Sequence, residues 1–418
     1  MSSAPRDRRP ATAPRLAVVG VHGHGRAHLR NAVRLHCAGR VELVAVVDPR
    51  PLSVADVQAL ADDLRDSGSV PRDAAVGALR LPWYGDLGSL LGSDVGAATV
   101  PDVVVLATPI HTHAPLAEQA LRAGCDVLLE KPPTASLHEY RRLLEVVADT
   151  GRAVQVGFQT FGSTTLAQIH RLVADGEIGE MRGVGATGAW VRSTDYWDRS
   201  PWTGRRTFAG RPVVDGVTTN ALAHAVATAL HLAGATAVDD VVGVELDQYR
   251  ANEIEVDDTT AVRITTSGGT VVSAGLTLCA REHATPLITV QGTAGTAVLD
   301  YYADTVTVTG RDGSRTTHGD RTDLLTNLID HRQDPSVPLL CALRDTGAFM
   351  RVLDSVRAAP DPVRIDPAQV ERVVDEAGTH LVVRGVADWC ARVATEHATF
   401  AELGAPWARH SDAAGRRP

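Results

Sequence analysis

Residues 15–28 read R-L-A-V-V-G-V-H-G-H-G-R-A-H, an apolar run followed by a turn rich in glycine and histidine. The run Arg15–Gly20 predicts a strand, and Ala27–Cys37 has the texture of a helix. Between them, Gly20, Gly23 and Gly25 let the backbone turn sharply and come close to a pyrophosphate, whose charge the N–H groups of the helix would meet. The stretch therefore predicts the strand, turn and helix that open a dinucleotide-binding domain.

The residues around this turn determine how specific the dinucleotide-binding pattern is. His22 stands where G-x-G-x-x-G would have its middle glycine, so the motif alone is a weak match, and a tight turn without a dinucleotide is the alternative. The next apolar run, Val41–Val47, ends at Asp48, about 20 residues beyond the last glycine, where such domains carry an acid. A carboxylate there accepts from both ribose hydroxyls and repels a 2′-phosphate, so NAD is favoured, while nearby Arg50 leaves NADP open.

Apolar strands alternate with helical segments through the N-terminal part. This order predicts a parallel sheet of the doubly wound α/β (Rossmann) type. The further strands expected are Val103–Ala107, Asp126–Leu129 and Ala153–Phe158, and the helices are Leu52–Asp66, Ala114–Ala123 and Leu137–Thr150, with residues 66–81 left unassigned.

Beyond residue 180 strand-like runs follow one another with short turns such as Ser267-Gly268-Gly269. This texture predicts an α+β C-terminal domain with a large, mainly antiparallel open sheet. From Asp323 the texture becomes helical, most clearly over Cys341–Arg357. The expected strands are Met181–Val191, Val241–Arg250, Thr259–Thr266, Thr270–Leu278, Pro286–Gln291, Thr296–Tyr301 and Thr305–Thr309.

Length and composition set the class of protein. A chain of 418 residues has room for two domains, and no apolar run approaches the roughly 20 residues that cross a bilayer. We expect a disordered tail over 1–14, a Rossmann domain over 15–134, a substrate-binding and oligomerisation domain over 135–403 and a C-terminal tail over 404–418. The tail lacks the apolar core of a secretory signal, so a cytoplasmic protein is expected.

Charge and cysteine content exclude several partners. The net charge of −9, without a basic cluster beyond the N-terminal tail, argues against nucleic acid. The five cysteines are scattered singly, in no C-x-x-C spacing, so we expect buried reduced thiols and no metal site.

The chain has a single lysine, Lys131, among 41 basic residues. Arginine keeps its charge and is a bulky fork, whereas a lysine amine is compact and exchanges a proton when its surroundings tune it. Either chance explains the survival of this one lysine, or its position requires an amine.

Two polar motifs follow strands of the predicted parallel sheet. Thr108-Pro109 leads to His111 and His113 after one strand, and Glu130 and Lys131 follow the next. Doubly wound sheets bind their ligands at the carboxyl ends of the strands, so these residues are expected to line the cofactor site together with the turn histidines His22 and His24. This density of histidines, with His28, keeps a metal there as the alternative.

With these motifs, the chain resembles the glucose-fructose oxidoreductase / inositol dehydrogenase (Gfo/Idh/MocA) family from Arg15 to about Leu403. The family's E-K-P stands at 130–132, its T-P-x-x-x-H at 108–113, its V-G-F/Y at 156–158 and its I-G-E at 178–180. The resemblance implies that Lys131 lies near the nicotinamide and the substrate. It also implies that the open face of the second sheet packs on another subunit, giving a homodimer or homotetramer.

The family's D-x-G-x-H or N-Q-x-x-H step corresponds to Asn220-Ala-Leu-Ala-His224, so the resemblance adds His224 and Asn220 to the catalytic set. A lysine and a histidine suit the oxidation of a sugar carbinol, since one removes the hydroxyl proton and the other holds the oxygen. We favour His224 as the base and Lys131 as the holding group, although the order can be reversed. Asp215 is an alternative acid.

Residues 190–206 hold three of the six tryptophans in an otherwise polar stretch. Aromatic faces flanked by charged groups suit a carbohydrate, and a subunit interface is the alternative. The expected substrate-binding residues here are Trp190, Arg192, Tyr196, Trp197, Arg199 and Trp202.

The sequence thus predicts an NAD-dependent oxidoreductase that transfers a hydride between a sugar, polyol or glycoside hydroxyl and the nicotinamide. One alternative is an enzyme that retains NAD and cleaves or epimerises glycosides by transient oxidation. Another is a non-catalytic regulator that binds NAD or a sugar, against which the lysine of E-K-P argues.

Overall fold

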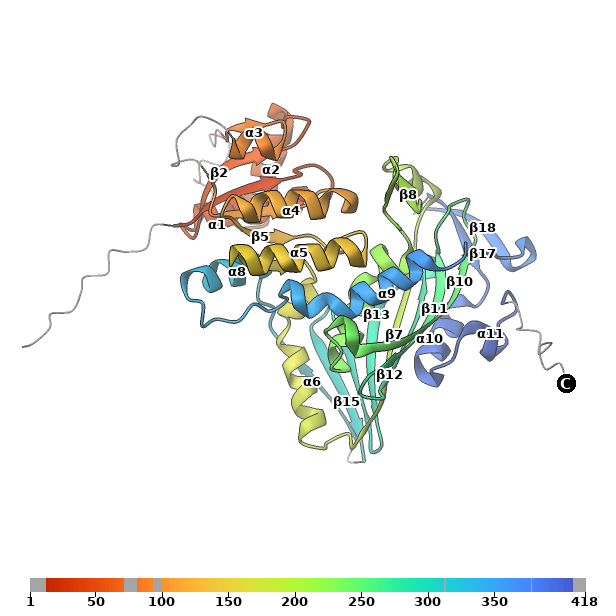
Figure 1. The fold of residues 1–418 in the computed structure, drawn as a ribbon. Coiled ribbons are helices and arrows are strands. Elements are labelled where there is room, and N and C mark those ends of the chain that lie inside the picture. Colours follow the sequence, from red (N-terminus) through yellow and green to blue (C-terminus); the bar gives the residue numbers. More distant parts are fainter. Residues whose placement is uncertain (1–12, 71–80, 93–99, 312, 377, 409–418) are drawn as a thin grey trace, which may run out of the picture. The chain divides into compact units, whose positions relative to one another are not determined.

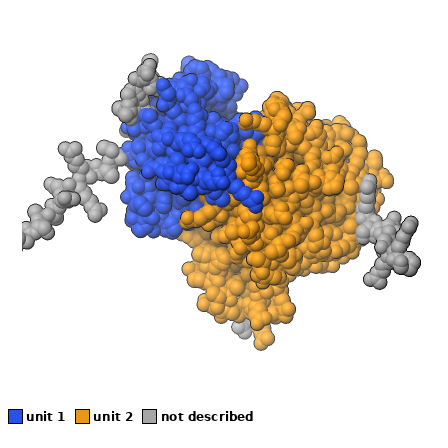
Figure 2. All heavy atoms as spheres, in the orientation of Figure 1, with its two compact units in different colours: residues 1–130, 141–157, 324–342 blue, residues 131–140, 158–323, 343–418 orange. Residues whose placement is uncertain are grey.

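The computed structural model describes residues 13–70, 81–92, 100–311, 313–376 and 378–408. The chain forms two compact units, coloured in Figure 2. Unit 1 consists of residues 1–130, 141–157 and 324–342, and unit 2 of residues 131–140, 158–323 and 343–418. The units interleave along the sequence, whereas we expected one cut after residue 134. Most of the expected tails, and residues 71–80, lie outside the described residues.

Unit 1 is built on a six-stranded sheet in the order β3-β2-β1-β4-β5-β6, with all neighbours parallel (Figure 1). Its strands are almost wholly apolar because both faces of such a sheet are covered. The strands are β1 Arg15–Val19, β2 Glu42–Val47, β3 Trp83–Tyr84, β4 Val103–Leu106, β5 Asp126–Leu129 and β6 Val154–Val156. The helices are α1 Gly25–Cys37, α2 Val54–Asp66, α3 Leu87–Leu91, α4 His113–Arg122, α5 Leu137–Thr150 and α8 Leu324–Gln333, and the division between the units falls within α5.

Unit 2 contains a nine-stranded sheet in the order β16-β15-β14-β13-β7-β12-β11-β10-β17. The pairs β12–β7 and β10–β17 are parallel and the others antiparallel. The strands are β7 Met181–Val191, β10 Val241–Arg250, β11 Thr259–Thr266, β12 Val271–Thr277, β13 Cys279–Gly292, β14 Thr296–Asp300, β15 Thr305–Gly310, β16 Gly313–His318 and β17 Val363–Arg364. Two small hairpins pair β8 Thr207–Phe208 with β9 Arg211–Pro212 and β18 Val370–Asp375 with β19 Gly378–Val383.

The centre of this sheet carries helices on both faces. α7 (Ala223–Leu232) and α10 (Val386–Glu396) both contact β7 and β12. Gly185 and Gly275 lie directly under the backbone of α10, where a Cβ would overlap Ala394 and Cys390, whereas Gly188 on the other face meets Leu222. The remaining helices of unit 2 are α6 Thr164–Ala174, α9 Gly347–Ala358 and α11 Phe400–Leu403.

The expected fold class is confirmed, and several elements have the expected bounds, among them β5, α5, β7, β10 and β11. The helix expected over Cys341–Arg357 is wrong at its start: a 3-10 turn covers Leu343–Thr346 and α9 begins at Gly347. We expected helices after Asp323, and this prediction missed the strands β17, β18 and β19. The strand β16, which precedes Asp323, was also missed. Strand β13 begins seven residues before Pro286, at Cys279, because bulges let its irregular first half stay paired with β7.

Two further observations concern the cysteines and the apolar character of the helices. All five cysteines are free; four are buried as expected, but Cys37 is exposed at the end of α1, which corrects the expectation for that residue. Among the described residues, no helix combines the length and the apolar character needed to span a bilayer.

Candidate active site

The glycine turn of unit 1 has the shape of a phosphate cradle. Gly20 and Gly23 have positive φ, at 80° and 57°. A Cβ on Gly20 would lie 2.8 Å from the carbonyl carbon of Ala107, and a Cβ on Gly25 would lie 2.7 Å from the carbonyl carbon of Gly20. These positions exclude side chains, and α1 begins at Gly25 with its first N–H groups at the turn. The geometry fits the pyrophosphate of a dinucleotide.

Asp48 orders this turn from the end of β2. Its Oδ2 accepts from Val21 N at 3.0 Å and its Oδ1 from Arg50 N at 3.0 Å. The side chain of His22 reaches the same corner, where its Nε2 donates to the Arg50 carbonyl at 3.1 Å. The carboxylate thus lies at the turn and keeps lone pairs for a ribose, as the sequence predicts for a dinucleotide domain.

The motifs after β4 and β5 lie at the same sheet edge as the glycine turn. Val19, Leu106 and Leu129 are paired in register across β1, β4 and β5, so the residues that follow each strand emerge together. Thr108 accepts at its backbone oxygen from His113 Nε2 at 2.7 Å, which fixes the start of α4. A 3-10 turn over Ile110–Thr112, preceded by Pro109, carries His111.

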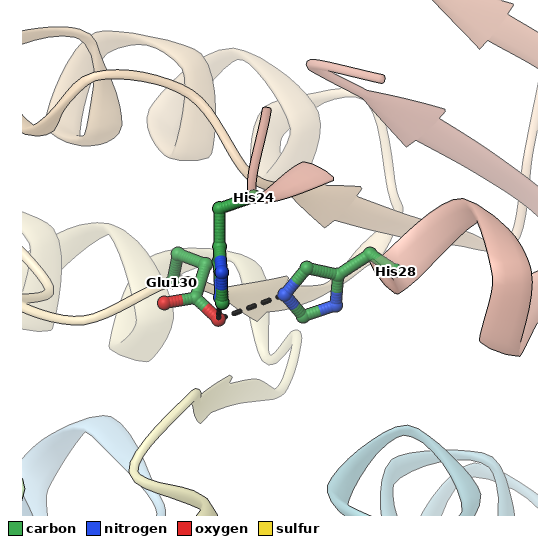
Figure 3. Close-up of side chains that lie close together, drawn as sticks. All are labelled: His24, His28 and Glu130. Carbon is green, nitrogen blue, oxygen red and sulfur yellow. Dashed lines mark hydrogen bonds and ion pairs between the residues drawn. The ribbon is translucent and has the colours of Figure 1, made fainter. Parts of the chain in front are cut away.

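Glu130 directly follows β5 and makes an ion cluster with His24, just before α1, and His28, within α1 (Figure 3). Its Oε1 lies 2.8 Å from His28 Nε2 and 3.4 Å from His24 Nε2. Burial opposes ionisation of Glu130, but the hydrogen bonds and charges of the two histidines outweigh it and hold the pKa of this carboxyl well below its ordinary value. His28 was absent from the predicted site, although its spacing of four residues from His24 places both on one helix face.

Lys131 belongs to unit 2, in which it is bound to Asn220. Its Nζ donates to the Asn220 side-chain Oδ1 at 2.7 Å and to the backbone oxygen at 2.9 Å. Two of the three predicted catalytic residues are therefore in direct contact, although they lie 89 positions apart in the sequence.

Asp215 continues this chain of contacts. It accepts from Asn220 Nδ2, from Gly204 N at 3.0 Å and from Arg199 Nη2 at 3.2 Å. Burial raises the pKa of Asp215, with the charge of Arg199 opposing the shift. The alternative acid of the sequence therefore lies next to Asn220, where it fixes the amide so that Oδ1 faces Lys131.

Asn220 lies within an irregular helix start, and His224 lies just after it. A π-helical segment covers Val217–Ala221 and α7 follows from Ala223, which places His224 in its first turn with its ring edge-on to Phe158 at 5.6 Å. Such segments are common at functional sites because they re-aim side chains. Gly216 starts this segment at a point where a Cβ would lie 2.9 Å from the Asp257 carboxyl carbon.

The aromatic stretch folds on itself through cation–π contacts. The Arg192 guanidinium lies 4.5 Å from the ring centre of Trp190 and 5.1 Å from that of Tyr196. Arg199 lies 3.7 Å from Tyr196 and 5.4 Å from Trp202. One face of each of these rings is already covered by a guanidinium, so fewer ring faces are left for a sugar than the sequence suggested.

A pocket of about 990 Å³ adjoins this stretch in unit 2. Arg199 and Gly204 line it and also hold Asp215, so the pocket lies beside the Lys131, Asn220 and Asp215 contacts. Its wall mixes charges of both signs with one indole, including Trp197, Arg205, Arg250, Glu253, Glu255 and Asp361.

A Rossmann unit with a glycine cradle, joined to an α+β unit in which a lysine is held by an asparagine and a buried aspartate, defines a two-domain dinucleotide-dependent protein. Residues 15–158 match the family model described as "Oxidoreductase family, NAD-binding Rossmann fold", and residues 166–298 match "GFO/IDH/MocA C-terminal domain". The chain belongs to the Gfo/Idh/MocA family, and its N-terminal unit is an NAD-binding Rossmann domain.

Curated relatives match over short regions. Inositol 2-dehydrogenase of Rhizobium meliloti (strain 1021) is 37% identical over 93 residues, 22% of this chain and 28% of the relative. The dTDP-3,4-didehydro-2,6-dideoxy-alpha-D-glucose 3-reductase of Streptomyces violaceoruber is 35% identical over 86 residues, 21% of this chain and 25% of the relative. These matches span about a quarter of each relative's length.

Solved structures share the fold over most of the chain. The WlbA dehydrogenase from Bordetella pertussis, in complex with NADH and UDP-GlcNAcA, has a TM-score of 0.61 at 21% identity and covers 82% of this chain and 94% of its own. UDP-N-acetylglucosamine 3-dehydrogenase GnnA from Acidithiobacillus ferrooxidans has a TM-score of 0.61 at 18% identity and covers 83% of this chain and 97% of its own. At these identities the likeness concerns the fold.

Proposed function

We propose that this protein is an NAD-dependent dehydrogenase or reductase that acts on a hydroxyl or keto carbon of a sugar, a polyol or a sugar carried on a larger group. The observation that carries the proposal is the chain of contacts from Lys131 through Asn220 and Asp215 to Arg199. It holds the only lysine of the protein by its amine, directly after the strand end of an NAD-binding domain.

The chain's own residues divide the work of such a reaction. The bound nicotinamide would supply the hydride acceptor or donor, and Gly20, Gly23, Gly25 and Asp48 would hold the dinucleotide. We assign Lys131 to hold the reacting oxygen through its amine, and His224 to take or return the hydroxyl proton. Asn220 and Asp215 are positioning residues, because their hydrogen bonds orient the lysine.

The pocket beside Arg199 supports a substrate larger than a single ring. Its volume of about 990 Å³ and its mixed charges suit a hydroxyl-rich group with a charged substituent. The relatives include enzymes named for inositol and for nucleotide-linked sugars, which fall in the same chemical class. We propose a cytoplasmic reaction on such a small molecule.

The test is to release and identify any dinucleotide from purified protein, and then to add NAD or NADP with panels of sugars, polyols and nucleotide-linked sugars while following the absorbance of reduced nicotinamide. Turnover with added NAD, and weaker turnover with NADP, is the expected result, because a carboxylate at Asp48 would repel a 2′-phosphate. Tightly held NAD with glycoside conversion and no net NADH would favour the NAD-retaining alternative. Absence of dinucleotide binding would overturn the proposal.

A further inference from the structure

The proposed reaction assigns no chemical step to the ion cluster of His24, His28 and Glu130. Two imidazoles four residues apart on α1 and one carboxylate at the end of β5 turn their ligand atoms toward one another (Figure 3). These three atoms all lie within 4.8 Å of one another. Two histidines and a carboxylate form a recurrent ligand set for divalent transition metals.

The two separations from Glu130 fit a metal centre. Ligand atoms bound about 2.0–2.2 Å from one ion lie roughly 2.8–3.6 Å apart at tetrahedral or octahedral angles. Glu130 Oε1 is 2.8 Å from His28 Nε2 and 3.4 Å from His24 Nε2. Small rotations of His24, whose side chain is 67% exposed, would bring all three atoms around one point.

The surroundings also favour a cation. Glu130 is 7% exposed at its side chain, and Gly157 leaves room beside it, since a Cβ there would come within 3.0 Å of Oε1. The exposed side of His24 leaves a direction from which water can complete the coordination.

We propose that His24, His28 and Glu130 form a binding site for one divalent transition-metal ion of the Zn²⁺ class. Without the ion, the same atoms are joined by the hydrogen bond between His28 and Glu130. With the ion, the start of α1 and the end of β5 are tied more firmly, and the carboxylate before Lys131 is fixed. The site is independent of the substrate proposed above.

The experiment uses the full chain without an affinity tag, stripped with a chelator. A Cys37→Ser background removes the exposed thiol as a competing zinc ligand. Zn²⁺ is titrated by calorimetry, and Co²⁺ by its visible absorption. We expect one equivalent of either ion, a rise in Tm with Zn²⁺, and at least tenfold weaker binding in His24→Ala and His28→Ala. Mg²⁺, which prefers oxygen ligands, should not compete.

The matched control is His138→Ala, which removes an exposed histidine from α5 and should leave binding unchanged. Glu130→Gln tests the carboxylate, and His24→Ala serves as the variant least able to disturb folding because its side chain is exposed. The proposal is overturned if no stoichiometric binding occurs, if binding survives His24→Ala and His28→Ala, or if His138→Ala weakens it equally.

Discussion

At the scale of single residues, Lys131 carries the most information. Its amine lies 2.7 Å from Asn220 Oδ1, inside a set of contacts that continues to a buried aspartate. A guanidinium is larger, spreads its charge over a plane and does not give up a proton. We infer that the position requires an amine in a protein whose other Lys or Arg positions are all arginine.

We expect Lys131→Arg to lower kcat/KM by about 10²–10⁴-fold, the range for a lost proton-transfer or oxygen-binding group. Dinucleotide binding should change less than turnover, because the substitution leaves the glycine cradle for the pyrophosphate unaltered. Steady-state kinetics and dinucleotide titration check both parts, with Arg344→Lys, at an arginine whose side chain is 82% exposed, as the control. Full turnover in Lys131→Arg would instead support the non-catalytic regulator.

At the scale of elements, a half-buried histidine of α7 packs against a histidine of α6. The ring of His231 on α7 lies 4.6 Å from Phe161 and 5.3 Å from His170 on α6. Burial, with a smaller contribution from the charge of His170, lowers the pKa of His231 from 6.5 to about 4. Protonation of this ring is therefore easier in the unfolded chain than in the folded one.

A depressed folded-state pKa makes the stability contribution of His231 complete above pH 6.5 and lost as the pH falls toward about 4. Its size is about 3 kcal/mol, at about 1.4 kcal/mol per pKa unit. We expect His231→Gln to flatten the fall of the unfolding free energy over this range, measured by urea unfolding at several pH values. His318→Gln, at an exposed histidine, should keep the wild-type pH dependence, and an unchanged slope in His231→Gln would contradict the assignment.

The contact of α10 with the sheet depends on glycine. A Cβ on Gly275 of β12 would lie 2.6 Å from the Cα of Cys390, whereas a Cβ on Gly243 of β10 would find its nearest neighbour at 3.7 Å. We expect Gly275→Ala to lower the free energy of unfolding by about 1–3 kcal/mol through overpacking, and Gly243→Ala to have little effect. Equal urea midpoints for the two variants would show that α10 shifts away at no cost.

At the scale of the whole molecule, the face of the large sheet that bears α10 is only partly covered. Gly185 pairs with Thr289, Thr289 with Val298 and Val298 with Thr307, so these residues share the face of α10. Thr289, Val298 and Thr307 are half-exposed, while their neighbours toward the other face are buried. We infer that the subunit contact implied by the family resemblance uses the part of this face on β13–β15.

We expect light scattering coupled to size-exclusion chromatography to give a homodimer or homotetramer. Val298→Arg should shift the protein toward the monomer, because a charge at the centre of this face would be buried by a partner subunit. Val242→Arg, at a residue 63% exposed on β10, is the control and should keep the wild-type mass. A monomeric wild-type protein would contradict the proposed subunit contact.

The sequence by itself determined what depends on local pattern. Continuous apolar runs, the glycine turn and the acid at Asp48 define the Rossmann unit, because strand burial and turn geometry are set by neighbouring residues. The single lysine and the E-K-P step point to Lys131 as a candidate catalytic residue from the sequence alone. Short edge strands such as β16 and β17 were missed because they carry little apolar pattern to detect.

Only the tertiary structure decided which distant residues meet. Lys131 meeting Asn220 across 89 positions, Arg199 meeting Asp215 across 16, and His28 meeting Glu130 across 102 all depend on how strands and helices pack. The covering of the sheet by α10 likewise rests on glycines whose role appears only when a backbone approaches them. Side-chain partners far apart in sequence are chosen by packing, and packing is a property of the whole fold rather than of any one segment.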